Sequence, residues 1–184
     1  MKQAPSLHIS TEEYLTRELT SPLRHEYVAG TIHAMAGAGR RHNLIAGNIS
    51  SRLRQAARGG PCRVFISGMK VRVPAGDAFY YPDVAAACDP ADTQEFYLEA
   101  PCLIVEVLSP ATEAIDRREK LHAYRTLPRL TEYVLVSQEA RHIEIHRREP
   151  AGDWILILLE ENDPVELRCL DVTLTMDEVY EDAL

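Results

Sequence analysis

Two acids and a lysine in the middle of the chain are residue types that act together in metal-assisted hydrolysis. Asp83 follows a proline at the start of an apolar run, Glu106 lies inside a second apolar run, and Lys120 follows in the next segment. Carboxylates on adjacent strands can share one hard divalent cation, which takes oxygen ligands and keeps several waters. Such a cation acidifies a bound water and neutralises charge on a phosphoryl group, while an ammonium stabilises the transition state. Phosphodiester cleavage is therefore the most economical hypothesis for these three residues.

Glu106 is the most informative of the three because of its apolar surroundings. The run Leu103-Ile104-Val105-Glu106-Val107-Leu108 is bounded by Pro101 and Pro110, which predicts a strand buried on both faces. An ionised carboxylate in such a strand costs several kcal/mol unless a cation or several hydrogen-bond donors meet it. Glu106 therefore needs a partner, and a metal ion is one candidate.

Lys120 is expected on a helix that Thr112 begins, and two interpretations of it remain open. Asp116 lies four residues before Lys120, so the two side chains share one face of that helix. On an exposed face they would form a surface ion pair that contributes a few tenths of a kcal/mol. If the helix folds back over the sheet with this face inward, the ammonium can reach the acids.

The rest of the chain predicts helices and strands within one α/β domain over residues 1–184. Ser10 stands three residues before Glu13, the spacing of a capping box, and predicts a short helix to about residue 19. Ile45, Ile49 and Leu53 recur every four residues and predict a helix over residues 40–58. Two strands are expected around a turn at residues 29–30, and others at 62–66, 69–73, 80–87, 103–108, 132–136, 142–147, 154–159 and 165–174. A loop at 89–100 and a helical turn near 177–180 complete the pattern, and the later strands should extend the sheet in antiparallel fashion.

The charge distribution is uneven. The chain has 20 Lys and Arg against 28 Asp and Glu, a formal net charge of −8, which taken alone argues against a nucleic-acid partner. Residues 27–76, however, contain no acid and eight basic residues, among them Arg41 and Arg52. This window predicts a locally positive face that contacts phosphates; the alternative is a solvated basic helix paired with acids elsewhere.

His42 lies three residues before Ile45, on the inward edge of the same helix at its start. A helix N-terminus favours anions, so an imidazole there can take part in substrate binding. The alternative is a hydrogen-bonded residue at the boundary of the apolar stripe.

Composition limits the setting of the protein. No stretch approaches the apolar length of a membrane span and the N-terminus lacks a signal-peptide pattern, so we expect a cytoplasmic protein without a membrane partner. The cysteines are scattered through apolar contexts, which favours reduced core residues over zinc ligands or disulfides. They are Cys62, Cys88, Cys102 and Cys169.

The motifs together resemble the Uma2 family of restriction-type endonucleases, over residues 24–154. Each motif alone is weak, and their combination is specific. The segments that carry the resemblance are Glu26-Tyr27-Val28-Ala29-Gly30, Arg41-His42-Asn43, Pro82-Asp83-Val84, residues 103–112, Asp116 with Lys120 and Tyr124, and residues 132–136.

This resemblance implies a place in the PD-(D/E)xK nuclease superfamily. That superfamily has a mixed central sheet flanked by helices, and its activity, where established, depends on magnesium. By resemblance, Asp83 and Glu106 are the metal-binding carboxylates and Glu26 is an additional acid from the first segment. The superfamily pattern places a lysine two residues after the glutamate, where this chain has Leu108; the family relocates it to the following helix, here Lys120.

The sequence therefore predicts a restriction-endonuclease-like α/β (α+β) fold and a magnesium- or manganese-dependent endonuclease. Nucleic acid, in the first instance DNA, is the expected substrate; His42, Arg41 and Arg52 are the expected substrate-binding residues, and the protein is expected to be a homodimer. Two alternatives remain: a catalytically silent nucleic-acid-binding or assembly module of the same fold, and a metal-dependent hydrolase of a small phosphorylated molecule.

Overall fold

The main sheet places the apolar run around Glu106 among its central strands. A computed structural model describes residues 8–35 and 37–184, and its largest sheet has the order β11-β10-β9-β8-β6-β3. The strands are β3 (Arg63–Ile66), β6 (Val84–Ala87), β8 (Pro101–Leu108), β9 (Glu132–Ser137), β10 (His142–Arg148) and β11 (Trp154–Glu160). Strands β8 and β9 run parallel, whereas the other neighbouring pairs are antiparallel. Because β8 has a neighbour on each side and a core against each face, a nearly continuous apolar sequence forms it.

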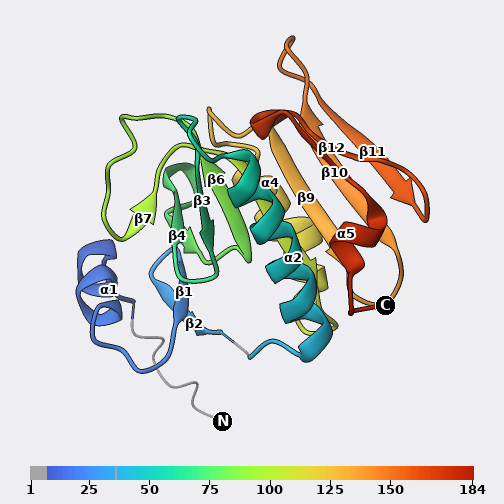
Figure 1. Ribbon diagram of the computed structural model, residues 1–184. Helices are drawn as coiled ribbons and strands as arrows, with labels where there is room; N and C mark the ends of the chain where they lie inside the picture. Colours follow the sequence, from blue (N-terminus) through green and yellow to red (C-terminus); the bar gives the residue numbers. More distant parts are fainter. Residues whose placement is uncertain (1–7, 36) are drawn as a thin grey trace.

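A second sheet of five strands, in the order β2-β1-β5-β4-β7, comes from the first half of the chain. Its strands are β1 (His25–Val28), β2 (Thr31–Ala34), β4 (Lys70–Val73), β5 (Ala78–Tyr80) and β7 (Tyr97–Leu98). Helix α1 (Thr11–Glu18) lies beside this sheet (Figure 1) and packs through Tyr14, which stacks on Tyr27 with ring centroids 5.0 Å apart. Of the predicted capping box one hydrogen bond is present: Ser10 Oγ accepts the Glu13 N–H at 3.1 Å and so caps the helix.

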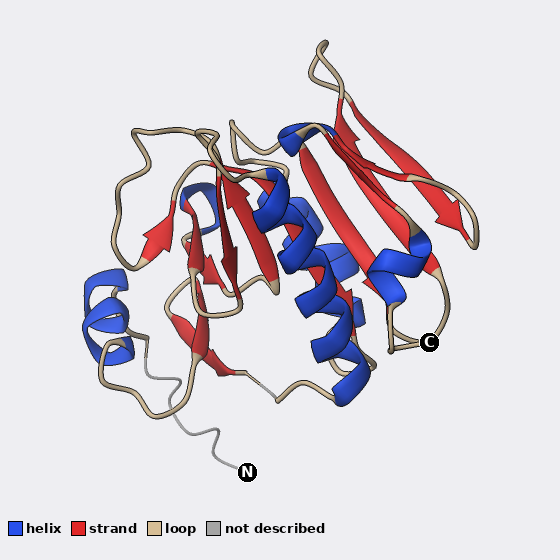
Figure 2. Ribbon diagram, in the orientation of Figure 1, coloured by secondary structure: helices blue, strands red, loops and turns tan. Residues whose placement is uncertain are grey.

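Helix α2 (Arg40–Ala56) covers one face of the six-stranded sheet (Figure 2). The predicted stripe of Ile45, Ile49 and Leu53 is buried in a core that includes Val105 of β8. Because side chains alternate along a strand, Ile104 and Leu108 belong to a second core on the opposite face. Glu106 falls in that second series, so its carboxylate points away from α2.

The connection from β8 to β9 crosses the face to which Glu106 points. Parallel strands require such a crossover, since the chain must return from one end of the sheet to the other. Here it consists of α3 (Glu113–Ile115), a π-helical turn η2 (Asp116–Lys120) and α4 (Leu121–Tyr124) in place of the predicted continuous helix. Thr112 is the N-cap residue, although its side chain makes no capping hydrogen bond. Tyr124 packs in the same core as Ile104 and Leu108.

The C-terminal segment packs beside α2. Strands β12 (Val165–Leu167) and β13 (Val172–Leu174) form a separate antiparallel pair joined by the 3-10 turn η3 (Arg168–Leu170). Helix α5 (Met176–Tyr180) begins with a capping box between Thr175 and Glu178. The apolar residues of these elements share the core under α2. The predicted strand over 165–174 is therefore two strands.

The prediction of one strand over residues 80–87 is wrong. Strands β5 and β6 belong to different sheets, and Tyr81, Pro82 and Asp83 form the passage between them. Pro82 has no N–H to donate to a ladder, and the Tyr81 N–H donates to a Glu26 carboxylate oxygen at 3.2 Å. The two strands predicted around residues 67 and 68, β3 and β4, likewise separate into different sheets.

Smaller differences concern β7 and β9. The predicted loop over residues 89–100 contains β7, which pairs in parallel with β4. The antiparallel extension is confirmed for β10 and β11, whereas β9 joins β8 in parallel.

No helix in the described residues is long and apolar enough to cross a membrane.

The prediction of separate, reduced cysteines is also wrong. Cys62 is bonded to Cys88, and Cys102 to Cys169, so all four are paired. The bonded cysteines are 26 and 67 residues apart in the sequence, and the fold brings each pair together.

Candidate active site

Lys120 lies at the centre of three carboxylates. Its Nζ is 3.0 Å from Glu106 Oε1, 3.0 Å from Glu26 Oε1 and 3.2 Å from Asp116 Oδ1. The lysine side chain is 6% exposed, while those of Glu106 and Asp116 are 5% and 2% exposed. Asp116 and Lys120 therefore do not form a surface pair; their shared helix face points into the protein.

The crossover explains why Lys120 reaches Glu106. The connection returns over the face of the sheet to which Glu106 points, and the turn η2 places Asp116 and Lys120 against that face. The Tyr133 hydroxyl, which comes from the parallel neighbour β9, donates to the Asp116 carbonyl oxygen at 3.1 Å and holds the turn on the sheet. Position 108 is filled by a buried leucine of the same core, so the ammonium comes from the helix and not from β8.

Asp83 lies at the start of β6, next to the strand that carries Glu106. Val84 pairs with Val105, and the Asp83 Oδ2 accepts the Val107 N–H at 2.8 Å. His42 of α2 approaches from the other face, with Nε2 3.0 Å from the same Asp83 oxygen and 3.1 Å from the Val107 carbonyl oxygen. Since both neighbours of Nε2 are acceptors, this nitrogen carries a proton and holds the Asp83 carboxylate in place.

Burial dominates the electrostatics of the site. It raises the pKa of Glu106 well above the ordinary value; the Lys120 ammonium opposes this rise, whereas Asp83, Asp116 and Glu26 add to it. Burial alone would lower the pKa of Lys120, but its neighbouring carboxylates hold that pKa well above the ordinary value. The ammonium is therefore charged throughout the physiological pH range, and the surplus of acids makes the site attractive to a further cation.

The pKa of Asp83 is also raised, chiefly by burial, although the Val107 N–H and the neighbouring His42 oppose the rise. Asp83 is thus a second carboxyl group whose negative charge the neighbouring protein groups do not fully stabilise.

The donor set fits a hard divalent cation. Among the described residues, the hydrogen-bond partners of Glu106 both contact Oε1 and the polar partners of Asp83 contact Oδ2, which leaves one oxygen of each carboxylate available. Two carboxylates with remaining positions filled by water and substrate are the usual ligand set for magnesium. In the described chain, no three ligand atoms from the site's acids and histidine lie within 4.8 Å of one another.

Glu26, the additional acid, comes from β1 of the smaller sheet. One of its oxygens, Oε1, accepts the Tyr81 N–H at 3.2 Å and contacts Lys120 at 3.0 Å. The passage of the chain between the sheets therefore positions this acid, and the structure brings together Glu26, Asp83, Glu106, Lys120 and His42.

The two arginines predicted to bind substrate lie outside this cluster. Arg41 is next to His42, and its guanidinium is 3.4 Å from a Glu139 oxygen on the surface. Arg52 lies ten residues after His42, about 15 Å along α2. It contacts Glu178 and Glu181 near α5 at 3.6 and 3.9 Å.

Tyr80, Tyr124 and Tyr133, whose contact with Asp116 is described above, also belong to the site, and sequence reasoning missed them as site residues. The Tyr124 hydroxyl donates to Glu106 Oε1 at 3.4 Å, and the Lys120 ammonium lies 5.6 Å from the centre of the Tyr80 ring. Tyr80 also donates to Glu119 at 2.9 Å. Of these tyrosines, Tyr124 could have been predicted from the sequence, because it lies four residues after Lys120 and therefore on the same helix face.

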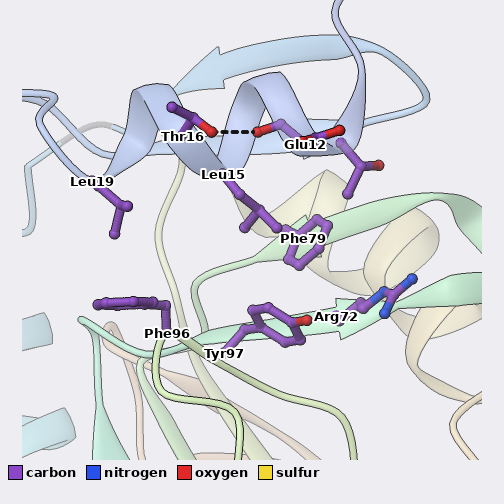
Figure 3. A pocket seen from close by; sticks show the side chains of 9 residues that line it. Glu12, Leu15, Thr16, Leu19, Arg72, Phe79, Phe96 and Tyr97 are labelled. Atoms are coloured by element: carbon purple, nitrogen blue, oxygen red, sulfur yellow. Dashed lines mark hydrogen bonds between the residues drawn. The ribbon is translucent and has the colours of Figure 1, made fainter.

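A cavity lies elsewhere in the described chain. It has a volume of about 390 Å³ and is formed between α1 and the outer face of the five-stranded sheet (Figure 3). Leu15 of α1 and Leu19, which directly follows this helix, face Phe79, Phe96 and Tyr97 across it. Its walls are mainly apolar, and the cluster around Lys120 contributes none of them.

The mixed sheet and the acid–lysine cluster are the features expected of a restriction-endonuclease-like protein. Residues 11–177 match the profile of the Uma2 family, described as "putative restriction endonuclease", and the chain belongs to this family. It is 35% identical to the uncharacterized protein slr1290 of Synechocystis over 96% of this chain and 94% of that one. A second Synechocystis protein, sll1609, also uncharacterized, is 29% identical over 89% of this chain and 95% of its own length.

A solved structure has the same fold. It is the crystal structure of a putative nuclease belonging to DUF820 from Anabaena variabilis, with a TM-score of 0.77. The likeness covers 96% of this chain and 99% of that one at 17% sequence identity. The restriction-endonuclease-type fold expected from the sequence is therefore confirmed.

Proposed function

We propose that the protein is a divalent-metal-dependent endonuclease that hydrolyses phosphodiester bonds in nucleic acid, with DNA as the substrate. The observation that carries this proposal is the approach of Lys120 to Glu106 beside Asp83, since two carboxylates and an ammonium are the groups such chemistry needs. The family to which the chain belongs supports the substrate class.

Each residue has a separate role in this proposal. Asp83 and Glu106 hold magnesium or manganese, which when bound supplies an acidified water and neutralises phosphate charge. His42 donates to Asp83 and fixes its orientation. Lys120 presents a positive charge to the scissile phosphate or the attacking water, and Glu26 and Asp116 position that charge.

The contacts of Lys120 bear on whether it can reach a substrate. An ammonium has three N–H donors, and three carboxylates lie within 3.2 Å of it. Among the described residues only the contact with Glu106 Oε1 has the geometry of a hydrogen bond, and Asp116 Oδ1 has no hydrogen-bond partner, so Lys120 can still donate an N–H to a phosphate oxygen. The burial of Lys120 among acids also fits the alternative function, a silent nucleic-acid-binding module in which Lys120 only stabilises buried acids.

A nicking assay on supercoiled DNA tests the proposal. The wild type should nick with magnesium or manganese and stop when the metal is chelated, and Asp83→Asn should lose the activity. Asp163→Asn is the matched control, because this carboxylate caps the Glu160 N–H in a surface turn. Metal binding and DNA binding without nicking would favour the silent module, and turnover of a small phosphodiester alone would favour the small-molecule hydrolase.

We also propose a homodimer joined along β11. This strand forms an edge of the six-stranded sheet, so one row of its backbone N–H and C=O groups has no strand partner in the described chain. It exposes Ile155, Leu156 and Leu158, an unusual concentration of apolar side chains for an edge. Pairing with β11 of a second copy would satisfy the backbone and cover these residues.

A further inference from the structure

The four cysteines meet at the end of the main sheet that is opposite to the acids. Cys62 directly precedes β3, Cys88 directly follows β6, Cys102 is the second residue of β8, and Cys169 lies in η3. Arg63 pairs with Ala87 and Ala87 with Pro101, so strand register brings the first three together. The disulfide between Cys102 and Cys169 adds the fourth.

The two disulfides are in contact with each other. Cys88 Sγ lies 3.4 Å from Cys102 Sγ, and the sulfurs of Cys88, Cys102 and Cys169 are all within 4.8 Å of one another. The fourth sulfur, that of Cys62, is bonded to Cys88. In a tetrahedral zinc site with Zn–S bonds of about 2.3 Å, the sulfurs are about 3.8 Å apart. Three of the four sulfurs therefore already lie within nearly the size of such a site, and the Cys62 sulfur, which is outside this group, has to move closer to complete it.

We propose that in the reduced chain these four thiolates bind one zinc ion in a closed, structural site. Reduction of each disulfide takes two electrons and two protons from one molecule of a dithiol reductant, which itself becomes a disulfide. Zinc then replaces the four thiol protons, which are released. Four cysteine sulfurs and no open position are typical of structural zinc.

Neighbouring side chains hold two of the cysteines in place through hydrogen bonds to their backbone groups. The Cys169 N–H donates to Glu132 Oε2 at 3.0 Å, and the fully buried Glu132 carboxylate is paired with Arg147 Nε at 3.0 Å. Arg63 donates to the Cys62 carbonyl oxygen at 2.8 Å. These contacts fix two of the four ligand segments through buried or local hydrogen bonds, so little ordering is left for the metal to impose. The four cysteines are half-buried, which leaves a path for metal and reductant.

This site is separate from the carboxylate site. Cys102 and Glu106 are four residues apart on β8, which is about 13 Å. The ligands also differ in kind, because thiolates select zinc whereas carboxylates and water select magnesium. Zinc here would join the ends of β3, β6 and β8 to η3 and so hold the C-terminal hairpin on the main sheet.

The test begins with the full-length wild type, purified without oxygen in the presence of a dithiol. Metal analysis should find one zinc per chain, and zinc should protect all four thiols from alkylation measured by mass spectrometry. Cobalt in place of zinc should give the sulfur-to-metal charge-transfer and intense d–d bands of a tetrahedral thiolate site. Persistence of both disulfides under this reductant would overturn the proposal, as would equal alkylation of four thiols with and without zinc.

Variants locate the metal. Cys88→Ser and Cys169→Ser should each weaken zinc binding on the order of a hundredfold or more, the share of one ligand in a structural zinc site. Glu106→Gln is the control, since it alters the carboxylate site and should leave the cobalt spectrum unchanged. Loss of the cobalt bands in Glu106→Gln but not in Cys169→Ser would place the metal at the acids and overturn the proposal. Protection of wild-type thiols by zinc tests the same point if a variant does not fold.

Discussion

Lys120 Nζ lies 3.0 Å from Glu106 Oε1, although one residue is on the crossover helix and the other inside β8. The helix thus supplies the cation that the buried strand glutamate needs. One ammonium nevertheless does not balance the charge of the acids around it, because Glu26 and Asp116 contact it as well as Glu106. Charge balance at this site depends on one lysine and on whatever further cation the acids bind.

Removal of the Lys120 charge should damage stability and activity together. Lys120→Met keeps the aliphatic stem but leaves three acids without their cation, which should cost on the order of 3 kcal/mol of unfolding free energy without metal. Nicking should fall on the order of a hundredfold. Lys120→Arg should restore stability better than activity, because a planar guanidinium does not replace an ammonium at one point. Chemical denaturation and nicking rates measure both effects; unchanged nicking in Lys120→Met would remove this residue from the mechanism.

Glu106→Gln should separate metal binding from folding. The substitution removes a buried charge of raised pKa, so the metal-free protein should keep or gain thermal stability while calorimetric magnesium or manganese binding is lost. Asp163→Asn, the surface control, should bind metal like the wild type. Normal metal affinity in Glu106→Gln would show that the ion is held elsewhere.

The raised carboxyl pKa predicts a pH dependence of stability. Because the folded pKa of Glu106 exceeds its unfolded value of roughly 4, its contribution is present at low pH and is lost as pH rises through the folded pKa. Relative to Glu106→Gln, the metal-free wild type should therefore become less stable as pH rises, and magnesium should reverse this loss. The measurement is a series of denaturation midpoints for both proteins; a constant difference across pH would contradict the prediction.

The basic residues of α2 should differ in their effect on DNA binding. Arg40 and Arg41 are exposed beside His42, whereas Arg54 and Arg58 are exposed about 20 Å or more further along the chain direction of α2. Reversal of Arg40 and Arg41 to Glu should weaken DNA binding about tenfold or more and reduce its salt dependence. Reversal of Arg54 and Arg58 is the matched control. Equal effects of the two double variants would indicate that phosphates contact the whole helix.

The oligomeric state should respond to β11. Sedimentation of the wild type at micromolar concentration should show a dimer, and Leu158→Lys should shift it to a monomer, since a charge cannot be buried in that contact. Ile66→Lys changes another exposed apolar residue, on β3, and should leave the dimer intact. A monomeric wild type would contradict the proposed interface.

The sequence predicted those parts of the structure that depend on local pattern. The apolar run around Glu106, the stripe of α2 and the cap at Ser10 each follow from spacing within a few residues, and each is confirmed. The sequence did not decide whether Asp116 and Lys120 face the sheet or the solvent, because residues four apart share one helix face whether that face is buried or exposed. Only the parallel pairing of β8 with β9, a long-range contact, decides it.

Long-range pairing also explains the failures. The division of residues 80–87 depends on Glu26, which is more than fifty residues away and takes the Tyr81 N–H. The meeting of the cysteines depends on the register of β3, β6 and β8, which sequence separation does not reveal. The acid partners of Arg52 lie in α5 and directly after it, so an acid-free window in the sequence did not imply an unpaired arginine in space.

The short passage from Tyr81 to Asp83 has a consequence for evolution by insertion and deletion. The passage leaves one sheet and enters the other. The N–H of its first residue, Tyr81, donates to the Glu26 carboxylate, and the carboxylate of its last residue, Asp83, accepts the Val107 N–H. One added residue would shift β6 by one position, and the side chains of that strand would exchange cores. Asp83 would then no longer face the Val107 N–H. We therefore expect active relatives to tolerate changes of residue type within this passage far better than any change of its length.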